Sequence, residues 1–72
     1  MSTPILAHTL YELHDKLWDM RPRSKYIYET RDGLICQMYH GLYQWYKNNG
    51  QGWFWSGSTK NRGAYTRRWK KL

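Results

Sequence analysis

The sequence predicts a small α+β protein, with an N-terminal helix packed on a three- or four-stranded antiparallel sheet and a short basic C-terminal helix or strand. Leucines recur at helical spacing near the N-terminus, runs rich in Tyr, Ile and Trp alternate with Gly turns up to residue 56, and the last residues are strongly basic. Because 72 residues leave no room for a second core, we expect one domain over 1–72. Its expected parts are a helix over 3–21, a sheet over 25–56 and a basic segment over 57–72.

The N-terminal helix is predicted by one apolar stripe. Thr3 or Ser2 is the expected cap, and Pro4 suits the first helical position because its missing N–H would be unpaired anyway. Pro22 disfavours a helical conformation at Arg21 and therefore sets the end. The stripe consists of Leu6, Leu10, Leu13, Leu17 and Met20, which lie three or four positions apart.

The first hairpin is predicted by strand formers around a tight turn. Asp32-Gly33 is a strong signal for a two-residue turn, and such a turn places Ile27 opposite Met38. We expect the helix to cover the face that carries Ile27, Leu34, Cys36 and Met38. The exposed face would then carry Tyr26, Tyr28, Ile35, Gln37 and Tyr39.

Two further turns extend the predicted sheet. His40-Gly41 leads into a strand over 42–46, where Tyr43 and Trp45 join the covered face and Leu42, Gln44 and Tyr46 join the exposed one. A turn centred on Asn49-Gly50 places Phe54 on the covered face and Trp53 and Trp55 on the exposed one. A loop one residue longer reverses those two faces, because side chains alternate along a strand.

The C-terminal residues fit two structures. Tyr65, Trp69 and Leu72 have helical spacing, whereas Tyr65, Arg67 and Trp69 alternate as in a strand. The sequence slightly favours the helix.

The charge is divided unevenly along the chain. Residues 1–36 hold five basic and five acidic side chains, whereas residues 37–72 hold seven basic side chains and no acidic one. Such asymmetry is typical of proteins with a polyanionic partner, most often DNA or RNA. The simpler alternative is a solvated basic tail that keeps the protein soluble.

No motif indicates catalysis or metal binding. His8 and His14 point to different sides of the predicted helix, no CxxC or HxxxH spacing occurs, and every acid precedes residue 33. The segment GSTK at 57–60 lacks the Walker order, although its backbone N–H groups beside Lys60 and Arg62 suit an anion. We therefore expect a non-enzymatic protein without a metal or cofactor.

The N-terminus and the single cysteine indicate location. The first residues have no basic n-region and carry charged residues within their apolar run, which argues against a signal peptide and a membrane span. Cys36 alone cannot form an internal disulfide, and a lone thiol fits a reducing, cytoplasmic setting.

Aromatic and basic residues together predict a nucleic-acid-binding surface. Aromatic rings on a sheet face stack unpaired bases, while basic side chains follow the phosphate backbone. The order of helix, sheet and basic segment is similar to that of double-stranded-RNA-binding domains, and STKNRGAY resembles their Ser-Lys-Lys segment, but the family's other motifs are missing and no residue is carried over. The predicted binding residues are Lys47, Trp53, Trp55, Lys60, Arg62, Arg67, Arg68, Trp69, Lys70 and Lys71, with Tyr28, Tyr39 and Tyr46 as stacking candidates.

The alternative is a protein-binding module. Trp, Tyr and Arg are the residues enriched at interface hot spots, and this chain is rich in all three. Under this interpretation the protein is a small inhibitor or adaptor of the phage or plasmid type, which binds an acidic surface of a larger, nucleic-acid-handling host protein. Self-association into a homodimer through the aromatic face is a third possibility.

Overall fold

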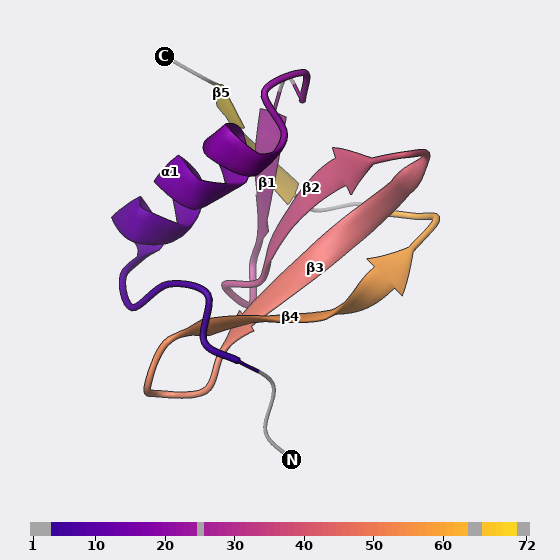
Figure 1. Ribbon diagram of the computed structural model, residues 1–72. Coiled ribbons are helices and arrows are strands. Elements are labelled where there is room, and N and C mark those ends of the chain that lie inside the picture. Colours follow the sequence, from indigo (N-terminus) through magenta and orange to yellow (C-terminus); the bar gives the residue numbers. More distant parts are fainter. Residues whose placement is uncertain (1–3, 25, 64–65, 71–72) are drawn as a thin grey trace.

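The computed structural model describes residues 4–24, 26–63 and 66–70, and it forms one helix packed on a five-stranded antiparallel sheet (Figure 1). The α+β class with a helix before the sheet is therefore confirmed, whereas the predicted number of strands is wrong. The basic segment adds a strand, so the favoured C-terminal helix is also wrong over 66–70. The elements are α1 (Leu10–Met20), β1 (Tyr26–Thr30), β2 (Ile35–Tyr39), β3 (Leu42–Asn48), β4 (Trp53–Thr59) and β5 (Thr66–Lys70).

Helix α1 begins later than predicted. Thr9 is its N-cap, and the Thr9 hydroxyl accepts a hydrogen bond of 3.1 Å from the Glu12 N–H. The Glu12 carboxylate in turn accepts one of 3.1 Å from the His8 N–H. Residues 4–9 are therefore not helical, and the expected caps at 2 and 3 lie outside the described residues. The helix ends at Met20, close to the end that Pro22 sets.

The strand order is β4-β3-β2-β1-β5, and every neighbouring pair is antiparallel. The first four strands form a meander. The chain then crosses from the β4 edge of the sheet to the opposite edge, where β5 pairs with the whole of β1. This return brings the basic C-terminal segment beside the first hairpin.

The first hairpin has a three-residue loop rather than the predicted two-residue turn. The Thr30 N–H donates to the Leu34 carbonyl at 2.9 Å, and the Gly33 N–H donates to the Thr30 carbonyl at 3.1 Å. Gly33 has a φ of 83°, a conformation that glycine adopts without a steric penalty. Ile27 consequently lies opposite Gln37, one residue away from the predicted register.

This slip reverses the faces of the following strands, because strand side chains alternate. The helix-side face carries Ile27, Ile35, Gln37, Tyr46 and Trp53, of which only Ile27 was predicted to face the helix. The turn at His40-Gly41 is present, since Tyr39 pairs with Leu42. The outer face carries Tyr26, Tyr28, Cys36, Met38, Tyr43, Trp45, Lys47, Phe54 and Arg68, so the predicted covered positions of Cys36, Met38, Tyr43, Trp45 and Phe54 are wrong.

The core lies between α1 and the helix-side face. The N-terminal segment closes it at the β4 edge, where the backbones of Ala7 and Trp53 form a bridge. Among the described residues no helix is long and apolar enough to cross a membrane. The buried cluster consists of Ala7, Leu13, Leu17, Ile27, Ile35, Tyr46 and Trp53.

Candidate nucleic-acid interface

Tyrosine rings and arginine side chains gather on the outer face. The rings of Tyr28 on β1 and Tyr43 on β3 meet edge to face, with their centroids 5.9 Å apart. The Arg62 guanidinium lies 4.1 Å from the centroid of the Tyr28 ring and donates a hydrogen bond of 3.0 Å to the Tyr43 hydroxyl. Arg62 comes from the segment that crosses between the two edges of the sheet, so tertiary structure creates this cluster.

Strand β5 adds a second guanidinium to the same face. Arg68 pairs with Tyr28, and its guanidinium carbon lies 5.0 Å from the centroid of the Tyr26 ring. The preceding residue, Arg67, pairs with Glu29. Its guanidinium carbon lies 4.8 Å from the centroid of the Trp69 ring on the helix side. Arg67 and Arg68 are adjacent in β5, and their side chains therefore lie on opposite faces of the sheet.

Cys36 is buried within the outer face. Loss of hydration raises the pKa of its thiol to about 12, and the nearby positive charge of Arg62 opposes that rise only in part. The thiol therefore stays protonated at neutral pH and is a poor nucleophile. Among the described residues, no three His, Cys, Asp or Glu side chains lie close enough together to hold a metal ion.

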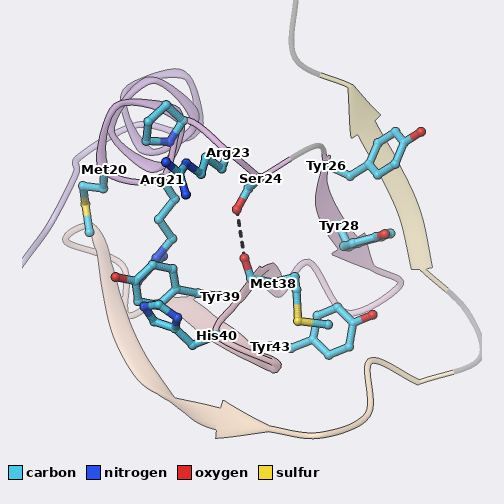
Figure 2. A pocket seen from close by; sticks show the side chains of 11 residues that line it. Met20, Arg21, Arg23, Ser24, Tyr26, Tyr28, Met38, Tyr39, His40 and Tyr43 are labelled. Carbon is cyan, nitrogen blue, oxygen red and sulfur yellow. Dashed lines mark hydrogen bonds between the residues drawn. The ribbon is translucent and has the colours of Figure 1, made fainter.

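A cavity of about 660 Å³ lies where α1 ends and the β2–β3 hairpin turns (Figure 2). Figure 2 shows Tyr26, Tyr28 and Tyr43 along one side of the cavity. On the other side Arg21 reaches toward Tyr39. No carboxylate is among the lining residues, which are Met20, Arg21, Pro22, Arg23, Ser24, Tyr26, Tyr28, Met38, Tyr39, His40 and Tyr43.

A smaller hollow of about 390 Å³ lies next to Tyr43. Lys60, Asn61, Arg62 and Gly63 form the rest of its lining, and none of them is acidic. Two cationic side chains in the lining of a small hollow suit a phosphate or carboxylate group. Lys60, the last residue of the GSTK segment, and Arg62 thus line the same hollow, and anion binding there stays a prediction.

The interior of the protein holds Arg21 in place at the larger cavity. Its Nη1 donates to the Gln37 side-chain oxygen at 2.9 Å and to the Tyr46 hydroxyl at 2.6 Å. Gln37 is fully buried and donates its own N–H to the Leu17 carbonyl at 3.1 Å. The guanidinium carbon also lies 4.5 Å from the centroid of the Tyr39 ring. Arg21 is thus oriented by buried polar groups and by one face of the cavity.

The predicted aromatic contacts fall on different parts of the structure. Tyr46 is 1% exposed and Trp53 is 8% exposed, so neither ring is available for stacking. Trp69 packs against the core, and its Nε1 donates to Glu29 at 3.0 Å. Trp55 is 48% exposed, but it pairs with Tyr46 on the helix side. Of the predicted rings, Tyr28 lies on the outer face, and Tyr39 lines the cavity from the other side.

The predicted basic contacts are divided in the same way. Arg62 and Arg68 join the outer face, Lys60 lies at the smaller hollow, and Arg67 faces the helix side. Lys47 is exposed on the outer face beside Phe54. For Lys70 only the backbone within β5 is described, and Lys71 lies outside the described residues.

Sequence reasoning missed several residues at the cavity. The sequence places Tyr26 on the exposed face without marking it as a binding residue, and the predicted face of Tyr43 is wrong. Arg21 and Arg23 are not among the predicted binding residues, and they lie in the half of the chain whose charges balance. The absence of any acid between Met20 and Tyr28 is the sequence signal that marks them.

The chain matches no family model, and no curated protein or solved structure is significantly similar to it.

Proposed function

We propose that this protein binds single-stranded nucleic acid without catalysis. One observation carries the proposal, namely an outer surface in which Tyr26, Tyr28 and Tyr43 lie in contact with the guanidinium groups of Arg62 and Arg68. Neutral rings and cations on one surface match a ligand that has both flat bases and phosphates.

The distribution of acids supports the same ligand. Glu12, Asp15 and Asp19 lie on α1, Glu29 points to the helix side, and Asp32 lies in the β1–β2 loop. Among the described residues, none of the five Asp and Glu side chains therefore lies on the outer face, where it would repel phosphates. Each stacked base contributes about 1–3 kcal/mol, and each neutralised phosphate adds a salt-dependent contribution.

The two adjacent arginines of β5 provide a matched test. Binding of a fluorescently labelled single-stranded oligonucleotide, followed by anisotropy at several salt concentrations, should show a log–log slope of about −3 if four cations contact phosphates. Arg68→Gln should weaken binding at every salt concentration and make the slope shallower. Arg67→Gln removes the same charge from the other face and should have the smaller effect.

Failure to bind any DNA or RNA oligonucleotide at low salt would overturn the proposal. Equal losses for Arg67→Gln and Arg68→Gln would also contradict it, because they would indicate a response to net charge alone. A nuclease-resistant complex with an acidic protein, combined with no affinity for oligonucleotides, would favour the alternative of a protein-binding module.

A further inference from the structure

The larger cavity has two chemically different sides. Tyrosine rings from β1 and β3 form one side, and the side chains of Arg21, Tyr39 and His40 form the other (Figure 2). Met38 and Ser24 lie between the two sides, where the Ser24 hydroxyl donates to the Met38 carbonyl at 2.9 Å. The volume of about 660 Å³ falls within the range of small-molecule sites. The cavity thus offers aromatic surface and positive charge within one concave site.

Arg21 is held in a fixed position and keeps hydrogen-bond donors for an anionic ligand. Its two hydrogen bonds to Gln37 and Tyr46 use the Nη1 hydrogens, which leaves the Nη2 and Nε donors of the same group for a further acceptor. Burying the Gln37 amide is costly unless it is hydrogen-bonded, and here its bonds connect α1 to the guanidinium. Because Arg21 is held from the interior, an incoming anion has less side-chain freedom to restrict.

We propose that this cavity binds a single unpaired nucleotide, with the base against the tyrosine side and a phosphate at Arg21. The inference rests on the proposed function and specifies the unit that the protein recognises. A base within a duplex is stacked and paired, so its ring faces are closed to the tyrosines. The cavity therefore gives the protein a preference for single strands over duplexes, which the basic groups alone would not supply.

Ligand fragments separate the two parts of the site. In an NMR titration of the ¹⁵N-labelled full chain, a nucleoside 5′-monophosphate should shift the amide signals of Arg21, Ser24 and Met38. The unphosphorylated nucleoside and inorganic phosphate should each bind more weakly than the monophosphate. Equal affinities for monophosphate and inorganic phosphate would overturn the proposal, because the cavity would then select the anion alone.

Two glutamate substitutions provide a matched pair. Met38 and Leu42 are 37% and 36% exposed and lie in the same hairpin, but only Met38 lines the cavity. Met38→Glu places a carboxylate beside the nucleotide and should weaken monophosphate binding about tenfold or more, as expected when like charges meet in a site. Leu42→Glu changes the net charge by the same amount and should leave most of the affinity intact.

Arg21 variants test the anion contact directly. Arg21→Lys keeps the charge but loses the planar set of donors, and it should weaken the monophosphate more than the nucleoside. Thermal unfolding of each variant reports whether the Gln37 and Tyr46 network still supports the fold. Because that network is structural, the Met38 and Leu42 pair decides the proposal if Arg21→Lys unfolds.

The outcomes distinguish this inference from the proposed function. Suppose that single strands and duplexes bind equally well and that Met38→Glu changes neither affinity. This result would contradict nucleotide binding in the cavity, while the proposed nucleic-acid surface would still stand. Loss of all oligonucleotide binding in the wild type would remove the proposed function itself. A single-strand preference that Met38→Glu abolishes and Leu42→Glu preserves would support both.

Discussion

The arginines at the candidate site are oriented by tyrosines. Arg21 lies over Tyr39, Arg62 over Tyr28 and Arg68 over Tyr26. A ring face attracts a cation through its quadrupole and does not cancel its charge, as a carboxylate would. Such contacts give each guanidinium a preferred position while keeping its attraction for phosphate.

The Cys36 thiol gives a prediction of pH dependence. Its pKa is raised by burial from 9.0 to about 12, so the unfolded chain releases the thiol proton first as pH rises. The resulting stabilisation is fully present below about pH 9 and should be lost between about pH 9 and pH 12. Urea unfolding at several pH values should show the stability difference between wild type and Cys36→Ala shrinking across that window. A constant difference would contradict the burial of the thiol.

Among the elements, two short sequence signals matter most. One sets the first residue of α1, and the other sets the register between β1 and β2. The sequence Thr9-Leu10-Tyr11-Glu12 has the spacing of a capping box, and it starts α1 six residues after the start suggested by Pro4. The loop Arg31–Gly33 uses three residues where Asp32-Gly33 suggested two. The first signal was visible in the sequence, whereas both loop lengths are compatible with Asp-Gly.

The N-cap of α1 can be tested by removing one hydroxyl. Thr9→Ala leaves the Glu12 N–H without its acceptor and should lower the free energy of unfolding by about 1 kcal/mol. Thr9→Ser keeps the acceptor and should retain most of the stability. Urea denaturation followed by circular dichroism measures both. An equal loss for both substitutions would show that the methyl group, and not the cap, stabilises the helix.

At the scale of the whole molecule, positive charge is concentrated within a small volume. The chain has a net charge of +7 and the structure spans 29 Å in its longest direction. Electrostatic interactions extend about 30 Å at 0.01 M salt and about 10 Å at 0.1 M. At low salt, each cation therefore interacts with all the others, and self-repulsion opposes the compact state.

Salt should therefore stabilise the free protein while weakening its complex with nucleic acid. The melting temperature at pH 7 should rise between 10 mM and 200 mM sodium chloride. The double variant Lys47→Gln with Arg67→Gln lowers the net charge by two from +7 and should show a smaller rise. A melting temperature that falls with salt would indicate that attractive pairs outweigh the repulsion.

The predicted helix stripe is wrong at its two ends, because Leu6 precedes α1 and Met20 is 52% exposed. The local sequence is enough to set the α+β class, the apolar spacing of Leu10, Leu13 and Leu17, the end of α1 before Pro22 and the excess of positive charge after residue 36. These features depend on local periodicity, proline geometry and composition, which need no knowledge of distant contacts. Which face of β2, β3 and β4 meets the helix depends on tertiary structure, because one extra residue in the first loop moves every later side chain to the other side. Tertiary structure also creates the site, since the pairing of β1, β2 and β3 brings Tyr28 to Tyr43, and the segment between β4 and β5 places Arg62 against both rings.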